Sequence, residues 1–157
     1  IPEPLIQKEF SRIMSLKDGL KKMSKSELSD LGRINLTDEK DQISNKIKKA
    51  KTDSLPIPSK VEELNNRPEA RNLLGIYASL ANLSLEKSIQ EFSGKNFSEF
   101  KEILSQILIE KINPISIEIK KLLNEKKHLD EILFKGCKEA DSLASKKIKK
   151  IHDIVGF

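Results

Sequence analysis

A long apolar stripe at helical spacing constrains the fold of this chain more than any other feature. Between Phe97 and Leu122, large apolar side chains recur every three or four residues. An α-helix of about 3.6 residues per turn places such residues on one face, so we expect a long helix whose apolar face, up to Leu123, is core. Pro114 falls inside it, and we expect either a kink there or two helices that meet. The stripe consists of Phe97, Phe100, Leu104, Ile107, Leu108, Ile112, Ile115, Ile119 and Leu122.

Shorter segments before the stripe show the same periodicity. The first helix is predicted to begin after Thr37 or Asp38, either of which can act as its N-cap. The second is predicted to begin near Pro68, because proline is well tolerated in the first turn of a helix. The third is short, with Ser84 as its cap and Gly94 at its end. The residues expected to face the core are Ile43, Ile47 and Ala50, then Leu73, Leu74, Tyr77, Leu80 and Ala81, then Leu85, Ile89 and Phe92.

Two further helices are predicted after the stripe. One covers residues 129–134 and is ended by Gly136, and the other runs from about Cys137 to Val155. No convincing strand follows residue 20, so the sequence predicts a mainly α fold whose body is a helical bundle. In the last helix, small residues every four positions would allow a close helix neighbour, and larger apolar residues would continue a buried stripe. These residues are Gly136, Ala140 and Ala144, and then Ile148, Ile151 and Ile154 or Val155.

The first 36 residues differ from the rest of the chain. Arg12–Leu16 is predicted to form a short strand or an extended segment. Lys17–Leu36 contains two glycines and several serines without sustained periodicity, and it is predicted to be a long loop. Loops of this length inside compact proteins are usually functional or mobile, so functional residues are expected here.

The charge balance favours an anionic partner, but only weakly. The net charge is +5, and lysine supplies most of the positive charge while also being the commonest way to solvate a helix surface. Two lysine clusters are present, and each is either a solvated helix face or a surface that follows phosphates. They are Lys46, Lys48, Lys49 and Lys51, and Lys146, Lys147, Lys149 and Lys150.

Other features exclude several classes of protein. A single cysteine, Cys137, excludes a disulfide framework and any cysteine-rich zinc site, which is consistent with the cytosol. His128 and His152 lie far apart without ligand spacing, so no metal site is predicted. No apolar run approaches the roughly 20 residues of a membrane span. We therefore expect a cytoplasmic protein without a membrane partner.

One pentapeptide in the loop is suited to chemistry on phosphates, namely Lys22-Met23-Ser24-Lys25-Ser26. Its two ammonium groups, three residues apart with hydroxyls beside them, can converge on a polyphosphate. When pyrophosphate is displaced, lysines on a loop that closes late can stabilise the charge that builds on the leaving group. A loop also allows the site to open for ATP and pyrophosphate. Without further signals, a lysine- and serine-rich segment would be interpreted as a solvated turn or a basic patch.

The pentapeptide has the sequence of the KMSKS motif, and the chain resembles the class I aminoacyl-tRNA synthetases. Its flanking segments resemble the tryptophanyl enzymes of the bacterial and organellar type. Residues 11–16 are similar to that family's ARIMSL stretch, and residues 33–38 and 46–54 are similar to its INLxD and KKIKxAxTDS segments. Residues 72–80 resemble its NLLxIYxxL helix, and residues 136–157 resemble its C-terminal helix. The resemblance covers essentially the entire chain.

The resemblance implies roles for individual residues. Lys22 and Lys25 would be the catalytic pair that binds the ATP phosphates. Ile13 matches a position whose backbone contacts the adenine in this family. Glu27 stands where aspartate is usual after the motif, which is a mild change that keeps the charge. The residues expected to bind ATP are Ile13, Lys22, Met23, Ser24, Lys25 and Ser26.

The same resemblance implies how the chain is organised. Residues 1–36 would be the end of a Rossmann-type catalytic domain with its KMSKS loop, and residues 37–157 a helical tRNA-binding domain. The chain is expected to be the C-terminal portion of a tryptophan–tRNA ligase, a homodimer when intact, whose partners are ATP, tryptophan and tRNA-Trp. Mg²⁺ would enter as the counter-ion of the nucleotide rather than through a site in this chain. No Gly-x-His sequence or βαβ pattern occurs here, so the chain alone is expected to be inactive.

Two other interpretations stay open. One is a free-standing, non-enzymatic helical module that binds RNA, which the basic balance and the absent catalytic half favour. A start codon near Ile1 would support the module, whereas a Rossmann-like half upstream would support the enzyme. The other is a tyrosyl-tRNA synthetase, which is less favoured because the segments after the pentapeptide match the tryptophanyl enzymes throughout.

Overall fold

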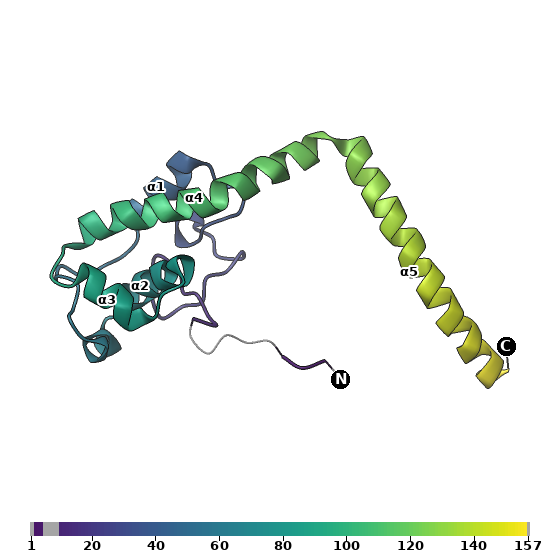
Figure 1. Cartoon of the computed structure of the whole chain (residues 1–157), viewed down its shortest axis with the longest axis horizontal. Helices are drawn as coiled ribbons and strands as arrows, with labels where there is room; N and C mark the ends of the chain where they lie inside the picture. Colours follow the sequence, from purple (N-terminus) through teal and green to yellow (C-terminus); the bar gives the residue numbers. More distant parts are fainter. Residues whose placement is uncertain (1, 5–9, 157) are drawn as a thin grey trace. The chain divides into compact units, whose positions relative to one another are not determined.

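The computed structural model describes residues 2–4 and 10–156 of the chain. Within this part, the predicted mainly α fold is confirmed (Figure 1). The contacts divide the chain into two compact units, Ile1–Ser116 and Ile117–Phe157. The helices, where η marks a 3-10 helix, are η1 (Asp30–Gly32), α1 (Lys40–Lys48), η2 (Val61–Asn66), α2 (Pro68–Ala81), α3 (Leu85–Phe92), α4 (Phe97–Asn124) and α5 (Lys126–Val155).

Helix α1 begins slightly later than its predicted caps would place it. Its N-cap is Glu39, which forms a capping box with Gln42, and the Glu39 N–H donates to Gln42 Oε1 at 2.8 Å. Such reciprocal bonds satisfy N–H groups that have no partner in the first helical turn. Asp38 does not cap the helix, because its carboxylate binds a lysine further along α1. Ile43 and Ile47 are fully buried, as predicted.

Helices α2 and α3 form where the sequence predicts them. Pro68 is the first residue of α2, and the helix ends at Asn82, which has a left-handed φ of 55°. Ser84 caps α3 by accepting the Lys87 N–H at 3.3 Å. Just beyond α3, Gly94 has a φ of 78°, which glycine adopts without steric strain. These turns allow α2 and α3 to pack against each other.

An aromatic cluster lies at the centre of the first unit. Tyr77 of α2 meets Phe92 of α3 with ring centroids 4.8 Å apart, and Phe92 meets Phe100 of α4 at 4.9 Å. The rings pack edge to face, and such pairs contribute about 0.5–1.5 kcal/mol beyond their buried area. The Tyr77 hydroxyl donates to the Glu91 carboxylate at 2.9 Å, so the one polar atom of the cluster has a partner. Three separate helices are therefore joined at one point.

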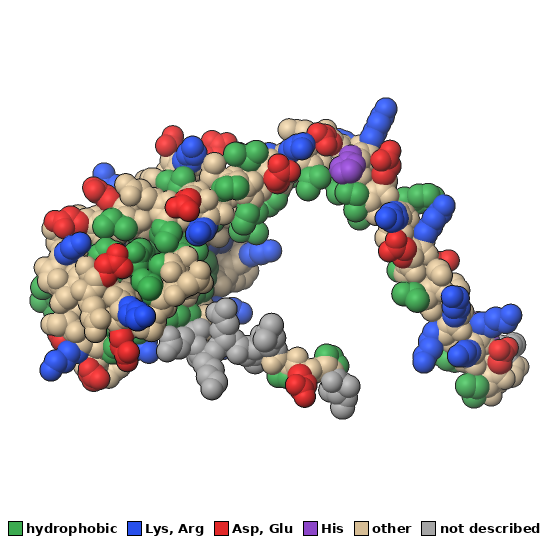
Figure 2. All heavy atoms as spheres, in the orientation of Figure 1, with side chains coloured by type: hydrophobic (Ala, Val, Ile, Leu, Met, Phe, Trp, Pro, Cys, Tyr) green, Lys and Arg blue, Asp and Glu red, His purple; other side chains and the backbone are tan. Residues whose placement is uncertain are grey.

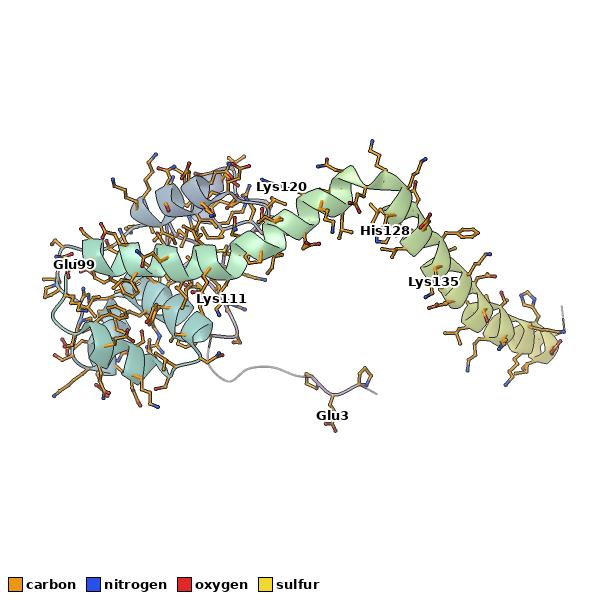
Figure 3. All side chains as sticks on the ribbon, turned by 45° about the horizontal axis from the view of Figure 1, so that its top comes forward. Glu3, Glu99, Lys111, Lys120, His128 and Lys135 are labelled. Carbon is orange, nitrogen blue, oxygen red and sulfur yellow. The ribbon has the colours of Figure 1, made fainter. Side chains whose placement is uncertain are left out.

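Helix α4 is buried mainly along its first half. Asn96 accepts the N–H of Glu99, a residue labelled in Figure 3, at 3.0 Å. Pro114 lies inside the helix, which continues past it, so the alternative of two separate helices is wrong. The predicted core face does not extend to its end, since Ile115 is 45% exposed and Leu123 is 58% exposed. The buried residues of α4 are Phe97, Phe100, Leu104, Ser105, Leu108 and Ser116.

Helix α5 departs from the prediction in two ways. It runs without interruption through Gly136, so the predicted short helix over residues 129–134 is wrong. A single glycine destabilises a helix by about 1 kcal/mol relative to alanine, which is too little to end a long one. No residue of α5 is buried, Cys137 included, so the predicted buried stripe is wrong as well. Figure 2 shows apolar side chains along the surface of this helix, and Figure 3 shows His128 and Lys135 projecting from it.

Candidate functional site

Residues 22–26, here called the signature loop, begin in a short antiparallel pairing. Met14 and Lys22 form an isolated β-bridge, and no longer strand occurs among the described residues. The predicted strand is therefore reduced to a single bridge within an extended segment. Hydrogen bonds on both sides strengthen it, so the first residues of the loop have a fixed register. They join the Ser15 N–H to Lys21 O at 2.7 Å and the Met23 N–H to Ile13 O at 3.0 Å.

Asn72 of helix α2 binds the free edge of this pairing. Its Oδ1 accepts the Met14 N–H and its Nδ2 donates to the Met14 carbonyl oxygen, both at 2.9 Å. The side-chain amide thus takes the place of a neighbouring strand, since it offers one acceptor and a donor. Asn72 is 9% exposed, so water competes little for these bonds. Sequence reasoning assigns Asn72 no role, although a polar residue beside the buried face of a predicted helix is a usable signal.

The tip of the signature loop is a tight turn that its own serines stabilise. The hydroxyl oxygens of Ser24 and Ser26 lie 2.8 Å apart, and the Ser26 N–H donates to Ser24 Oγ at 3.3 Å. The Glu27 N–H closes the turn on the Ser24 carbonyl oxygen at 3.4 Å. Local hydrogen bonds of this kind allow serine to favour turns over helix.

The two lysines of the signature loop, Lys22 and Lys25, have exposed side chains. Neither Lys22 nor Lys25 makes a side-chain hydrogen bond or ion pair with any residue in the described part of the chain. Their neighbour Lys21 differs, because it pairs with Asp18 at 3.4 Å. An ammonium group without an internal partner is available to bind an anion from solution.

Glu27, immediately after the signature loop, binds back to the extended segment. Its carboxylate accepts the hydroxyl of the buried Ser15 at 3.1 Å, and Ser15 Oγ accepts the Lys17 N–H at 3.2 Å. The carboxylate lies directly against Gly32, where a Cβ atom would collide with it. Glycine at this position therefore allows the close approach. Sequence reasoning treated Glu27 only as a replacement for aspartate and missed this contact.

Arg33 joins the backbone after the loop tip to the acidic residue of η1. Its Nη1 donates to Glu27 O at 2.7 Å and makes a longer contact with Ser24 O at 3.5 Å. Its Nη2 pairs with the Asp30 carboxylate at 2.9 Å. Charge-assisted bonds of this kind are stronger than bonds between neutral groups. Sequence reasoning also missed this residue, which it named only as part of a flanking segment.

Lys46 does not belong to a solvated or phosphate-following surface, which corrects the interpretation of the first lysine cluster. Its side chain is 4% exposed, and its Nζ donates to Asp38 Oδ2 at 2.6 Å and also pairs with Asp30. Asn35 donates to Asp30 Oδ1 at 3.0 Å. The bond from Lys46, followed by that from Asn35, lowers the pKa of the Asp30 carboxyl. A buried ammonium needs such partners because desolvation disfavours an unpaired charge.

The remaining cluster lysines are at the surface. Lys48 and Lys49 are exposed, while Lys51 pairs with Glu69 at 2.8 Å. The second cluster, on α5, is exposed throughout and consists of Lys146, Lys147, Lys149 and Lys150.

Two hollows border the site. One, of about 450 Å³, lies beside the signature loop, and the other, of about 440 Å³, lies beside Ile13. Both combine basic and polar side chains with apolar ones. The first is lined by Met23, Ser24, Lys25, Arg33, Asn35 and Thr37, among others, and the second by Arg12, Ile13, Met14, Arg71, Asn72 and Glu86, among others.

Two further observations concern residues 2–4 and 10–156. They contain no group of three or more His, Cys, Asp or Glu side chains placed to hold a metal ion. Their helices also include none that is both long enough and apolar enough to cross a bilayer.

The signature loop and its supports lie within the part of the chain that matches a known family. A family model described as tRNA synthetases class I (W and Y) matches residues 1–114. The chain belongs to this family. The signature loop and its flanking segments predicted a class I aminoacyl-tRNA synthetase, and this prediction is confirmed.

Curated proteins named tryptophan–tRNA ligase are similar along the whole chain. The protein of Agrobacterium fabrum is 49% identical over 155 residues, which are 99% of this chain and 44% of that protein. The protein of Rickettsia felis is 48% identical over 157 residues, which are 100% of this chain and 47% of that protein. The chain thus spans less than half the length of these relatives.

Solved structures show the same fold. Tryptophanyl-tRNA synthetase from Mycoplasma pneumoniae superposes with a TM-score of 0.74 at 26% identity, over 96% of this chain and 45% of that one. The enzyme from Campylobacter jejuni complexed with ADP and tryptophan gives a TM-score of 0.72 at 24% identity, over 99% and 47% of the two chains. At that identity the second comparison shows the fold alone.

Proposed function

We propose that this chain serves tryptophan–tRNA ligation. The observation that carries the proposal is a KMSKS loop whose base is held by hydrogen bonds and whose two lysines are exposed, without a partner among residues 2–4 and 10–156. Its support is the similarity of the whole chain to proteins named tryptophan–tRNA ligase. In the reaction, a carboxylate oxygen of tryptophan attacks the α-phosphorus of ATP, and the bond to pyrophosphate breaks. A hydroxyl of tRNA-Trp then attacks the resulting adenylate, and AMP leaves.

In this proposal Lys22 and Lys25 bind the ATP phosphates and stabilise the charge on the departing pyrophosphate. Met23 and the hydroxyls of Ser24 and Ser26 complete the loop around them. Interactions that strengthen as charge develops accelerate the step, whereas those that bind ATP equally throughout do not. The ATP brings Mg²⁺ as its counter-ion, and no residue of this chain is assigned to the metal.

Ile13 is assigned to the adenine through its backbone. Its carbonyl oxygen already accepts the Met23 N–H, so the position of Ile13 and the start of the signature loop are coupled. A base that contacts the backbone here would lie beside the hollow that Ile13 lines. Adenine and phosphate contacts would then come from the two paired segments of one hairpin.

The rest of the chain is assigned to tRNA. We propose that residues 1–36 end a catalytic domain and that residues 37–157 form a helical tRNA-binding domain. Exposed lysines on α5 support this, because phosphate contacts dominate the affinity for nucleic acids. The intact enzyme is proposed to be a cytoplasmic homodimer.

Tryptophan-dependent exchange of pyrophosphate into ATP tests the proposal on the full-length gene product. Exchange with tryptophan and not with tyrosine is expected. Lys25→Ala should lower kcat by about 10²–10³, the range seen when one transition-state donor is removed, with little change in the KM for tryptophan. Lys21→Ala is the matched control, since this neighbouring lysine pairs with Asp18. Exchange with tyrosine alone, or RNA binding without any exchange, would sink the assignment.

A further inference from the structure

A chain of polar contacts links helix α1 to the signature loop. It begins at Lys46, passes through the Asp30 carboxylate to the Arg33 guanidinium, and ends on the carbonyl oxygens of Glu27 and Ser24. All of these residues belong to the first compact unit. The contacts therefore form a continuous physical connection between the helical body and the turn that contains Lys25.

The Lys46 end of this connection is fixed in the core. Its Nζ also donates to Asp38 at 2.6 Å, and the side chain of Asp38 is 5% exposed. Ile43 and Ile47, on the same helix, are fully buried. A lysine side chain is ordinarily free to rotate, but burial and two carboxylates hold this one. The position of Asp30 is therefore set by α1.

The Arg33 end is fixed by the geometry of its guanidinium. One nitrogen pairs with Asp30 at 2.9 Å while the other donates to Glu27 O at 2.7 Å. The planar fork of arginine makes both contacts at once, which the single ammonium of lysine does not reproduce. The side chain of Arg33 is 18% exposed, so solvent weakens the contacts only in part. Glu27 O and Ser24 O flank the loop tip on both sides of Lys25.

We propose that Arg33 is a positioning residue for the signature loop and that Lys46 holds it in place through Asp30. The kinetic consequence rests on the proposed function. Arg33 binds the backbone of the loop and so keeps the turn ordered before ATP binds. Lys25 then meets the phosphates without a separate step in which the turn becomes ordered. A displacement of about 1 Å at a reacting group can lower a rate by about 10².

The kinetic test compares two arginines in the full-length gene product. Arg33→Ala removes the contacts with Asp30 and the loop carbonyls. The control is Arg67→Ala, because Arg67 also binds one carboxylate, that of Asp53, and two backbone carbonyls, but away from the loop. We expect Arg33→Ala to lower the kcat of pyrophosphate exchange about 10- to 100-fold with an unchanged KM for tryptophan. Arg67→Ala should stay within about twofold of wild type where all variants are folded.

Asp30→Asn is a second variant that keeps the size of a half-exposed side chain. It removes the charge between Lys46 and Arg33, and we expect a smaller loss of kcat in the same direction as Arg33→Ala. Equal losses in Arg33→Ala and Arg67→Ala would show a general effect of stability and would overturn the proposal.

Amide hydrogen exchange without substrate gives a readout that does not depend on the reaction. We expect the amides of Ser26 and Glu27, which donate to Ser24 in the turn, to exchange at least tenfold faster in Arg33→Ala and at the wild-type rate in Arg67→Ala. Unchanged protection in Arg33→Ala would overturn the positioning role even if the enzyme uses tryptophan. Faster exchange together with a wild-type protein inactive toward tryptophan would support the positioning role and reject the proposed function.

Discussion

Helices α2 and α5 both carry apolar residues at helical spacing, but only α2 buries them. Eight of the 14 residues of α2 are buried, whereas none of the 30 residues of α5 is. The apolar residues of α2 pack against α3 and against the aromatic cluster. Those of α5, such as Leu143 at 73% exposure, face solvent in this chain. Helix α2 is therefore stabilised by tertiary packing and α5 by local interactions.

Local interactions can support a helix of this length. Isolated helices become appreciably stable in water only beyond about 12–15 residues, and α5 is twice as long. The Ser145 hydroxyl donates to the Asp141 carboxylate, four residues earlier on the same helix, at 3.3 Å. Gly156 ends the helix in the left-handed conformation, with a φ of 84°. The difference teaches that the same periodic pattern specifies a helix but not what covers its apolar face.

The sharpest test of this contrast removes one phenylalanine from each unit. Phe100→Ala should destabilise the first unit by about 3–5 kcal/mol, because Phe100 is fully buried and contacts three other rings. Phe134→Ala on α5 should change stability by less than about 0.5 kcal/mol, because Phe134 is 62% exposed. Denaturant unfolding measures both, with near-ultraviolet circular dichroism at the tyrosine band for the first unit and far-ultraviolet circular dichroism for a signal that includes α5.

The near-ultraviolet probe for that experiment is specific to the first unit. The chain has one tyrosine and no tryptophan, and Tyr77 lies inside the aromatic cluster. Far-ultraviolet circular dichroism reports on α5 as well. Coincident transitions with both probes, or equal losses in the two variants, would contradict the contrast between the units.

The next largest loss of stability is expected when the buried charge of Lys46 is removed. Lys46→Met should destabilise the first unit by about 3 kcal/mol, at the low end for a broken buried ion pair, because Asn35 still donates to Asp38. Lys146→Met on α5 is the control and should be close to neutral, since Lys146 is exposed. Urea unfolding monitored at Tyr77 measures the difference, and a neutral Lys46→Met would refute the burial of this ammonium.

A smaller loss of stability, which depends on pH, is expected when Arg67 is replaced by alanine. Its hydrogen bonds lower the pKa of Asp53, so the folded state favours the charged carboxylate. The stabilisation is therefore present above the ordinary pKa of the group and is lost as the pH falls below about 4. Arg67→Ala should lose about 1–2 kcal/mol at neutral pH and less in acid. Stability curves of both proteins between pH 7 and pH 3 test this, and parallel curves would contradict it.

The smallest expected effect is a gain in the stability of helix α5. Gly136 lies within the helix, and a Cβ atom there would meet nothing within 4 Å. Gly136→Ala should therefore stabilise the helix by about 0.5–1 kcal/mol and raise the helical signal. Gly75→Ala in α2 is the contrasting variant, since its Cβ would collide with the ring of Phe10. Loss of helical signal in Gly136→Ala would indicate a contact on α5 that the structure does not show.

The helices were predictable because their signals are local. Periodicity, the cap at Ser84 and the proline at the start of α2 lie within a few residues of the elements they specify. The start of α1 was missed because Asp38 binds Lys46, eight residues away, instead of capping the helix. The sequence around Asp38 is compatible with a helix cap and with an ion pair to Lys46, and only the packed structure shows that the ion pair forms.

Of the candidate site, only the exposed pentapeptide was predicted from the sequence, and the residues that hold it in place were not. The pentapeptide contains Lys22 and Lys25, the two residues that the proposed function assigns to the phosphates, and the structure finds both side chains exposed. The supporting roles of Asn72 and Arg33 were not assigned from the sequence, since both side chains bind the backbone of another segment. Arg33 contacts carbonyl oxygens, which every residue has, and no sequence pattern marks which carbonyl is bound.

The two hydrogen bonds between Asn72 and Met14 affect the order in which the chain can fold. They join residues 58 apart in sequence, and closing a loop of that length costs about 3–4 kcal/mol of chain entropy. The segment from Met14 to the signature loop leaves the ribosome first, but the amide that completes its hairpin arrives only with α2. A nascent chain therefore gains this support for its signature loop only once α2 has been made, and a product truncated before Asn72 would lack it.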